Sequence, residues 1–337
     1  VLTLVEEPPS LHRNGMVLVD LKIFKIFILR SGLFVIEESK IFVTGGNGLV
    51  GSCVTGKHKP KSSDVNLLDF DQTYQFIADN SITHVVHCAA KVGGVKENSE
   101  KLGEFFYENM KMNLNLIEAC RLNKVEKVVS ILTTCIFPDK ANYPLTCDQL
   151  HNGEPHDSNY GYAHAKRMLE INARAYRDQY GMNIVNVIPC NVYGPRDNFN
   201  TQSGHVVPGL INKAYHAKWS GSPLEVWGDG SPLREFLYSE DLGKILDWVL
   251  HNYDDPEPLI ISPDEEISIK HIAKKLKDIY GLDEIIFQDD MPMGQLRKPS
   301  DNSRFKRLMQ DYCLTPFDEG LKKTALWFND NYESARK

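Results

Sequence analysis

The chain has 337 residues, of which 42% are hydrophobic and 25% are charged, and its formal net charge at pH 7 is −7. This length predicts about two domains of ordinary globular composition, because roughly 150 residues make one domain. An acidic chain without a run rich in Lys and Arg lacks the positive surface that binds a phosphate backbone, so we expect no nucleic-acid partner.

The cysteines and the apolar stretches exclude two further classes of protein. Seven cysteines, an odd number without any C-x-x-C pair, predict neither a disulfide framework nor a metal site. This use of cysteine fits a reducing, cytoplasmic location. The most apolar stretch, residues 17–36, contains four charged residues, whereas a membrane span needs about 20 mostly uncharged ones. We therefore expect no membrane-spanning helix.

From residue 40 onward, short β-rich runs alternate with longer helical patterns, which is typical of a parallel sheet covered by crossover helices. Strands are predicted over residues 40–44, 84–88, 127–132 and 183–188, and helices over 105–123 and 162–180. After about residue 195 the pattern predicts helices at 241–250, 267–280 and 317–332, and short strands at 259–262 and 284–288. The predicted fold class is α/β, a doubly wound parallel sheet with a smaller C-terminal α/β domain.

This pattern also predicts the division of the chain into parts. Residues 1–39 form an unassigned extension, and residues 40–195 form a dinucleotide-binding domain that is shortened at 52–63. Residues 196–337 mainly form a substrate-binding domain, from which residues 235–262 are expected to return to the first domain.

A glycine-rich turn follows the first of these strands. It runs Gly45-Gly46-Asn47-Gly48-Leu49-Val50-Gly51, a G-x-x-G-x-x-G pattern. Glycines let a backbone approach a pyrophosphate, and the free N–H groups of a helix start stabilise its charge, so the order strand, turn, helix predicts a dinucleotide site. A glycine turn between any strand and helix is the alternative.

The segment after this turn is abnormally short. The acidic residue that binds the ribose normally follows about 20 residues later, after a helix and a second strand. Here Asp64 is only 13 positions beyond Gly51, and a Gly and a Pro lie between them. The first helix must be stunted or the second strand missing. Two readings stay open for Lys57, Lys59 and Lys61, which either meet a ribose 2′-phosphate or form a solvated basic loop.

Two Tyr-x-x-x-Lys pairs place a phenol and an ammonium on one helix face. A neighbouring positive charge lowers the pKa of a phenol, so that it can exchange a proton with a carbonyl. Only the pair Tyr162 and Lys166 has a partner at a strand end, because Thr133 follows the strand predicted at 127–132. We therefore choose Tyr162 and assign Tyr107 and Lys111 to a helix surface.

Cys135 and His205 are further candidates for proton transfer. Cys135 lies two residues after Thr133, where it is either a thiolate base or an inert buried cysteine. His205 precedes a predicted helix, where it is either a proton carrier or a cap or surface residue.

Seven segments then match one family: TGGNGLVG, AAKVGG, TTCIFPDK, NYGYAHAKRM, IPCNVYGPRDNFN, GHVVPGLI and VWGDGSPLREF. Together they resemble the GDP-L-fucose synthases, which are extended short-chain dehydrogenase/reductases. The resemblance runs from about residue 40 to residue 337, with a gap around 52–63. It implies an NADP(H)-dependent enzyme that epimerises C3 and C5 of GDP-4-keto-6-deoxy-D-mannose and reduces C4, giving GDP-L-fucose.

The resemblance also implies catalytic roles. Cys135 and His205 act as base and acid on opposite faces of the sugar. Tyr162 gives its proton to O4 while NADPH delivers hydride to C4, and Lys166 lowers the pKa of the phenol and holds the nicotinamide ribose. Thr133 stands where the family usually has Ser and keeps the hydroxyl.

Binding residues and a partner follow from the same resemblance. The cofactor is expected to contact Gly45, Gly46, Asn47, Gly48, Leu49, Val50, Gly51, Asn66, Leu67, Ala89, Ala90, Lys166, Pro189, Cys190, Asn191, Val192 and His205. The GDP-sugar is expected to contact Lys213, Trp227, Arg234 and Lys298, with core packing as the alternative for Trp227 and a surface ion pair for Arg234. Helices 105–123 and 162–180 are expected to form the interface of a homodimer.

Residues 1–39 match nothing in the family, and this leaves two explanations. The run KIFKIFILR, residues 22–30, adds a strand in place of the lost one, or the extension and the shortening are both products of a faulty transcript. Two alternative functions follow: a catalytically impaired nucleotide-binding homologue, or another sugar-nucleotide epimerase or dehydratase.

Overall fold

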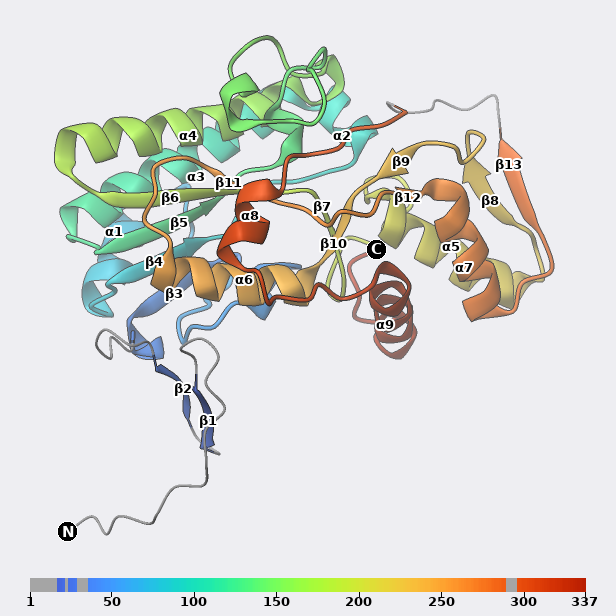
Figure 1. Ribbon diagram of the computed structural model, residues 1–337, viewed down its shortest axis with the longest axis horizontal. Helices are drawn as coiled ribbons and strands as arrows, with labels where there is room; N and C mark the ends of the chain where they lie inside the picture. The colour runs from blue at the N-terminus through green and yellow to red at the C-terminus, as the bar shows by residue number, and fades with distance from the viewer. Residues whose placement is uncertain (1–16, 22–23, 29–35, 289–295) are drawn as a thin grey trace. The chain divides into compact units, whose positions relative to one another are not determined.

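The structure, a computed structural model, describes residues 17–21, 24–28, 36–288 and 296–337 (Figure 1). The chain divides into a small unit that ends at Glu37 and a large unit that runs from Glu38 to Lys337. None of the helices in the described part of the chain is long and apolar enough to cross a membrane.

The small unit contains a strand pair. β1 (Val17–Leu21) and β2 (Phe24–Ile28) are antiparallel and form a two-stranded sheet of their own. The hypothesis that the run 22–30 replaces a strand of the large sheet is therefore wrong for its described residues, because these pair with β1. Residues 22, 23, 29 and 30 of that run lie outside the described residues.

A five-stranded parallel sheet forms the centre of the large unit. Its order is β11, β6, β5, β4 and β3, and each of these strands lies within one residue of a predicted strand at either end. The bounds are β3 Ile41–Thr44, β4 His84–His87, β5 Lys127–Ile131, β6 Asn183–Pro189 and β11 Leu259–Ile261. Since the strands are parallel, their carboxyl ends lie along one edge, where ligands of such sheets bind.

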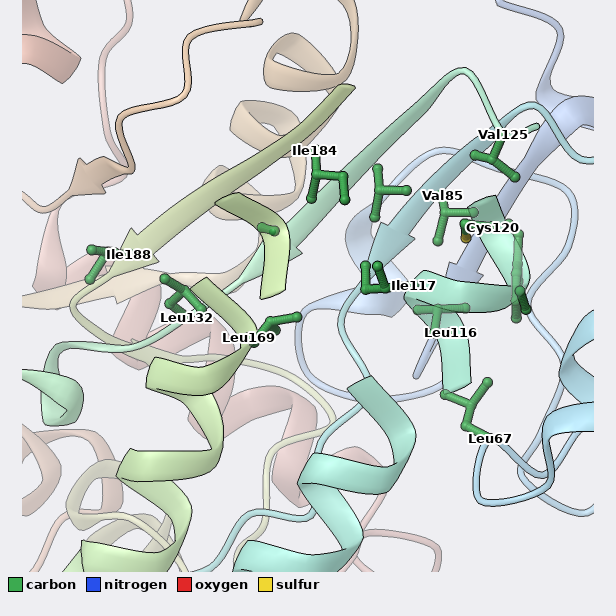
Figure 2. Packing of buried hydrophobic residues seen from close by; sticks show 14 of the residues in the cluster. Leu67, Val85, Leu116, Ile117, Cys120, Val125, Leu132, Leu169, Ile184 and Ile188 are labelled. Atoms are coloured by element: carbon green, nitrogen blue, oxygen red, sulfur yellow. The ribbon is translucent and has the colours of Figure 1, made fainter. Parts of the chain in front are cut away.

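Helices cover both faces of this sheet (Figure 1). One face carries α1 (Phe70–Asp79), α3 (Leu102–Leu122) and α4 (Tyr160–Tyr180), whose apolar sides share one buried cluster with the strands. Figure 2 shows Leu116, Ile117, Leu169 and Ile184 within this cluster. The other face carries α6 (Ser239–Asn252), which packs on β4 and β5. The helices predicted at 105–123 and 162–180 are confirmed, and each begins two or three residues earlier than predicted.

The segment after the glycine turn is the main departure from an ordinary doubly wound sheet. In place of a helix, one 3-10 turn spans Gly51–Cys53, so the predicted stunting of the first helix is confirmed and the expected helix start is wrong. In place of a second strand, His58 makes a single parallel bridge to Phe42. The backbone N–H of Val43 donates to the His58 carbonyl at 2.9 Å.

Helix α6 packs against this shortened segment. Gly243 allows the close approach, because a Cβ there would lie 2.5 Å from the Cys53 carbonyl oxygen. The Asp247 carboxylate accepts hydrogen bonds from the Thr55 backbone N–H at 2.9 Å and from the Thr55 hydroxyl at 2.7 Å. These contacts fix the turn against a helix that lies nearly 200 residues later in the chain.

The remaining elements surround a second buried cluster. Its helices are α5 (Val206–Ser220), α7 (Ile269–Tyr280) and α9 (Phe317–Asp330). Its strands form three pairs, β7 (Asn191–Tyr193) with β10 (Phe236–Tyr238), β8 (Leu224–Trp227) with β13 (Ile285–Gln288), and β9 (Leu233–Arg234) with β12 (Ile267–Ser268). The helix predicted at 267–280 begins two residues late, because residues 267–268 pair with β9 instead. Two short helices, α2 (Val95–Glu100) and α8 (Ser303–Leu308), complete the unit.

The contact between Asp247 and Thr55 gives a testable contribution to stability. The variant Asp247→Ala is expected to lower the free energy of unfolding by roughly 1 to 2 kcal/mol, because two hydrogen bonds that hold the shortened segment are lost. Urea denaturation followed by circular dichroism measures this change. Asp278→Ala, at an exposed carboxylate of α7, is the matched control and is expected to change stability by less than about 0.5 kcal/mol. Equal effects of the two variants would contradict the role of Asp247.

Candidate functional site

The glycine turn closes tightly on itself at the carboxyl end of β3. Gly45 has φ +63°, and a Cβ there would lie 2.9 Å from the backbone N and Cα of Ala89. A Cβ at Gly51 would overlap the Gly45 carbonyl oxygen, which accepts a hydrogen bond from the Gly48 N–H at 2.9 Å. Glycine is therefore required at both ends of the turn.

The backbone of this turn resembles the usual pyrophosphate-binding turn in one respect and differs from it in another. Within the part of the chain that the structure describes, the N–H groups of Leu49 and Val50 donate no hydrogen bond, so they are free to bind phosphate oxygens. The single 3-10 turn after Gly51 supplies no long helix dipole to add to them. The residues of the turn therefore fit the pyrophosphate through their backbone amides alone.

Lys59 packs over the same turn. A Cβ at Gly46 would lie 2.5 Å from the Cβ of Lys59, and the Lys59 ammonium donates to the Ser52 carbonyl at 3.3 Å. The Lys59 carbonyl accepts from the Asn47 side-chain amide, also at 3.3 Å. Of the three lysines considered for the ribose phosphate, Lys59 is therefore part of the turn, whereas Lys57 and Lys61 are exposed.

The other predicted cofactor residues lie on neighbouring loops at this edge. Leu67 is buried and its carbonyl accepts from Asn115 of α3 at 2.9 Å, while the Asn66 side chain accepts from the Leu68 N–H at 3.1 Å. Ala89 and Ala90 lie two and three residues after the end of β4, and Pro189 ends β6. Cys190 is buried and its N–H donates to Ile261, and the Asn191 side chain donates to the Glu235 carbonyl at 2.9 Å. Val192 belongs to β7.

A buried hydrogen-bond chain, which the sequence analysis missed, links these loops. His87 Nδ1 lies 2.8 Å from the Thr44 hydroxyl, and its Nε2 lies 2.9 Å from the Asn113 side-chain oxygen. The Thr44 hydroxyl also accepts from the Ala89 N–H at 3.0 Å. Burial lowers the pKa of His87 to about 4, so the imidazole is neutral and acts as a fixed linker between β3, β4 and α3. The sequence signal that could have revealed this chain of hydrogen bonds is a polar residue at the end of each of two adjacent strands, Thr44 in β3 and His87 in β4.

Thr133 and Cys135 lie at the carboxyl end of β5. Thr133 is the residue that caps the short turn 134–136, and its hydroxyl oxygen accepts from the Cys135 N–H at 3.5 Å. The hydroxyl hydrogen of Thr133 is not used in that bond. The Cys135 side chain is half-buried, so it is not enclosed in the core.

Lys166 and Tyr162 lie one helical turn apart on α4 and face this strand end. The Lys166 ammonium donates to the Ile131 carbonyl at 2.8 Å. Burial lowers the pKa of Lys166 to about 8, and the nearby Cys135 and Cys88 oppose this shift. The other pair of the same spacing is on the helix surface as predicted, because Tyr107 is 60% exposed.

The net shift of the Tyr162 pKa is upward, opposite to the lowering expected from its pairing with Lys166. Burial raises the pKa of Tyr162, and the negative charge of a Cys135 thiolate raises it further. Tyr162 is therefore a protonated phenol at neutral pH, which is the form that a proton donor needs.

Cys135 lies within electrostatic range of two cations. Burial raises the pKa of its thiol, whereas the Thr133 hydroxyl, Lys298 and Lys166 oppose this rise. Burial lowers the pKa of Lys298, the thiolate of Cys135 opposes that shift, and the charge of Arg234 adds to it. Tyr162, Lys166, Cys135 and Lys298 thus form one electrostatically coupled cluster, with Arg234 beside it.

Lys213 and Trp227 form a second pair beyond this cluster. The Lys213 ammonium lies 4.8 Å from the centroid of the Trp227 ring and donates to the Glu225 carbonyl at 3.3 Å. Trp227 is 45% exposed, so the core-packing alternative for it is wrong. Arg234 donates to the Leu233 carbonyl at 2.7 Å and is half-buried rather than paired on the surface.

His205 is held by different contacts from the cluster around Cys135. It is exposed, it immediately precedes α5, and its side chain makes no hydrogen bond to the first turn of that helix. It interacts electrostatically with Asp197, which the sequence analysis did not single out. Burial raises the pKa of Asp197 to about 6, and the charges of His205 and Arg336 oppose this rise.

Comparison with known proteins shows the family to which the chain belongs. The model of the NAD dependent epimerase/dehydratase family matches residues 41–262. A GDP-L-fucose synthase of Dictyostelium discoideum is 42% identical over 315 residues, which cover 89% of this chain and 98% of that protein. A probable GDP-L-fucose synthase of Drosophila melanogaster is 36% identical over 319 residues, covering 88% and 99%. The crystal structure of a GDP-L-fucose synthetase from Naegleria fowleri bound to NADP has a TM-score of 0.84 and 40% identity, and the match covers 88% of this chain and 94% of that chain.

The matched residues include both the glycine turn and the cluster around Tyr162 and Cys135. The family model spans more than half of the chain, and the likeness to these relatives extends over nearly all of the large unit. The chain therefore belongs to the NAD dependent epimerase/dehydratase family.

Proposed function

We propose that the chain converts GDP-4-keto-6-deoxy-D-mannose to GDP-L-fucose, by epimerisation at C3 and C5 and reduction at C4 with NADPH. One observation carries this proposal. A protonated phenol, a half-buried thiol and two lysines are coupled at the carboxyl end of β5, in a chain that matches a GDP-L-fucose synthase over 89% of its length.

Cys135 and His205 are the proton carriers of the epimerisations. The 4-keto group acidifies the C–H bonds at both C3 and C5, so one pair of residues serves both carbons. Inversion needs one group to remove a proton from one face and another to return a proton to the opposite face. Lys298 and Lys166 favour the thiolate of Cys135 and so support its function as a base.

Tyr162 is the proton donor of the reduction. Its raised pKa keeps the proton on the phenol until O4 gains negative charge. The hydroxyl of Thr133 donates to the same oxygen when substrate is bound, and charged Lys166 stabilises the phenolate that remains. NADPH, when bound, supplies the hydride that reaches C4.

The binding residues divide between the two parts of the chain. We propose that residues 40–195 hold the cofactor, through the turn 45–51, Asn66, Leu67, Ala89, Ala90, the segment 189–192 and Lys166. His205, from the second part, also contacts the cofactor. Residues 196–337 mainly hold the GDP-sugar, where Lys213, Arg234 and Lys298 oppose the charge of the diphosphate and Trp227 offers an exposed ring.

A homodimer and a cytoplasmic setting are part of the proposal. Large apolar side chains are exposed on α3 and α4, the two helices expected at the interface; they are Phe106, Tyr107, Leu114, Leu122, Tyr160 and Tyr180. All seven cysteines are free thiols, which suits a reducing compartment.

Two substitutions separate the two halves of the reaction. Cys135→Ser is expected to lower the entry of solvent deuterium at C3 and C5 by about 100-fold or more, because a general base is lost. Tyr162→Phe is expected to lower NADPH oxidation by a similar factor while deuterium still enters. Mass spectrometry of the sugar and absorbance at the nicotinamide band measure the two rates.

The chain offers a matched control for each variant. Cys313→Ser replaces an exposed cysteine, and Tyr107→Phe replaces the tyrosine of the other Tyr-x-x-x-Lys pair, so both are expected to keep wild-type rates. Undiminished deuterium entry in Cys135→Ser would remove the thiol from the mechanism. That result would favour another sugar-nucleotide epimerase or dehydratase reaction.

The two half-reactions are also expected to respond to pH in opposite directions. Reduction needs charged Lys166, whose pKa is about 8, so kcat/KM for NADPH oxidation falls as the pH rises through 8. Deuterium entry needs the thiolate of Cys135, whose pKa is raised by burial, so it increases with pH over the same range. In Lys166→Arg the guanidinium stays charged, and the falling limb moves to higher pH. Parallel pH profiles for the two rates would contradict these roles.

The shortened segment after Gly51 supports one alternative function, a catalytically impaired nucleotide-binding homologue. The missing helix and second strand leave the adenosine half of the cofactor with fewer contacts. Titration with NADPH, followed by nicotinamide fluorescence, distinguishes the two functions. The enzyme is expected to show saturable binding, whereas an absence of saturation would favour the impaired homologue.

A further inference from the structure

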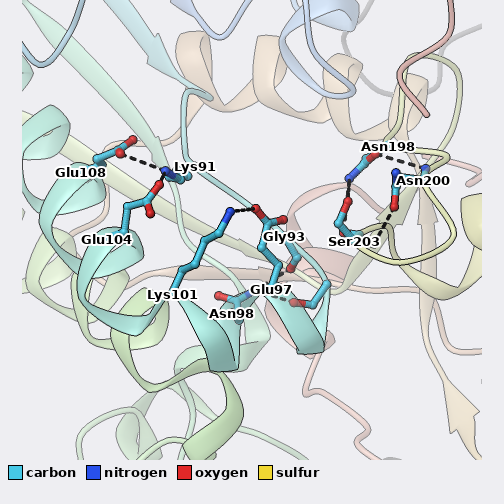
Figure 3. Close-up of polar contacts among 11 residues, drawn as sticks. Lys91, Gly93, Glu97, Asn98, Lys101, Glu104, Glu108, Asn198, Asn200 and Ser203 are labelled. Atoms are coloured by element: carbon cyan, nitrogen blue, oxygen red, sulfur yellow. Dashed lines mark hydrogen bonds and ion pairs between the residues drawn. The ribbon is translucent and has the colours of Figure 1, made fainter.

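Hydrogen bonds within the loop that carries His205 make it compact (Figure 3). Buried Phe199 joins this loop to the second cluster, since its N–H donates to the Arg336 carbonyl at 2.8 Å and its carbonyl accepts from the Asn212 side chain at 2.7 Å. The Asn198 side-chain amide donates to the Ser203 carbonyl at 3.2 Å, and the Asn200 side-chain oxygen accepts from the Ser203 N–H at 2.9 Å. Gly204 closes the loop, since its N–H donates to the Asn200 carbonyl at 2.8 Å and a Cβ there would overlap the Asn198 carbonyl oxygen. The loop is thus compact, but these contacts alone do not fix it to the sheet.

A second loop, from the end of β4, touches the first at its far end. The Gly94 N–H donates to the Ser203 carbonyl at 2.6 Å. A Cβ at Gly94 would lie 3.0 Å from the Gly204 carbonyl oxygen and 3.1 Å from the Ser203 carbonyl carbon. Gly94 has φ −69°, which any residue adopts, so only this contact requires glycine there.

Asn98 holds Gly94 and its neighbour Gly93 by hydrogen bonds, and Figure 3 shows Asn98 beside Gly93. The Asn98 side-chain amide donates to the Gly93 carbonyl at 2.6 Å and to the Gly94 carbonyl at 3.1 Å, and Asn98 is 5% exposed. A Cβ at Gly93 would in turn lie 2.9 Å from the Phe105 ring of α3. These contacts therefore connect helix α3 through Gly93 and Gly94 to Ser203.

We propose that Gly94 is a positioning residue for the epimerisation, because its backbone contact with Ser203 places His205 against the sugar ring. This inference rests on the proposed function, in which His205 is one of the two proton carriers. The His205 side chain is exposed and makes no hydrogen bond to the first turn of α5, so its position follows from the backbone of its loop. Gly94 is the point at which that backbone meets a loop of the parallel sheet.

The variant Gly94→Ala tests this role, because the new Cβ must push Ser203 and Gly204 away by a few tenths of an ångström. Single-turnover formation of GDP-L-fucose needs both inversions and is expected to fall about tenfold, since small displacements of a proton carrier cost rate steeply. In the reverse direction, the first turnover begins when hydride passes from C4 of GDP-L-fucose to NADP⁺, before any inversion. That step depends on Tyr162 and is expected to stay within about threefold of wild type.

Gly209→Ala is the matched control. Gly209 lies on α5 four residues after His205, and a Cβ there would meet no atom within 4 Å. This control is expected to keep both rates. Asn98→Ala is the second variant, which removes the hydrogen bonds below Gly94 without adding bulk, and it is expected to show the same imbalance between the two directions.

Amide hydrogen exchange of the peptide that covers residues 198–206 gives a readout independent of activity. Exchange is expected to become faster in Gly94→Ala and in Asn98→Ala, and to stay unchanged in Gly209→Ala. Unchanged exchange in both of the first two variants would overturn the proposal. An active wild type whose Gly94→Ala variant loses both directions equally, or neither, would overturn the positioning role while leaving the proposed function intact. A wild-type chain that catalyses neither direction would overturn the proposed function and this role with it.

Discussion

The parallel register of β3, β4, β5 and β6 is the constraint on which the rest of the site depends. Because these strands end along one edge, the segments after Thr44, His87, Ile131 and Pro189 all begin there. The buried chain from Thr44 through His87 to Asn113 keeps this edge fixed, since a neutral imidazole with two partners satisfies polar groups of two strands and a helix. Each loop then adds one chemical group to a common region.

Burial determines how the groups of that region ionise. It raises the pKa of Tyr162 and of Cys135 and lowers that of Lys166 and of Lys298, so each group is moved toward its neutral form. The opposing charges, chiefly between the Cys135 thiolate and the two lysines, partly restore the charged forms. A site arranged in this way holds a phenolic proton and permits a thiolate, which are the two states that reduction and epimerisation need.

The shortened segment after Gly51 shows how a doubly wound sheet tolerates the loss of a helix. The turn 51–53 rests on α6 through Gly243, and Asp247 holds Thr55. A single bridge at His58 and the packing of Lys59 over Gly46 cover the edge where a second strand would lie. The amides of Leu49 and Val50 remain free in the described structure, so the phosphate-binding part of the turn survives the shortening.

The sequence by itself determined the fold class, the five strands of the main sheet, the glycine turn and the position of Tyr107 on a helix surface. These features are local or periodic, because strand runs, glycine spacing and a residue at a strand end are all legible over a few positions. Only the tertiary structure decided that β2 pairs with β1, that Lys166 faces the Ile131 carbonyl, and that burial raises the pKa of Tyr162. It alone joined His87 to Asn113 and Gly94 to Ser203. Apart from the local pairing of β1 with β2, these contacts bring together residues that are tens to more than a hundred positions apart. The burial that shifts a pKa is a property of the packed interior, which no short stretch of sequence specifies.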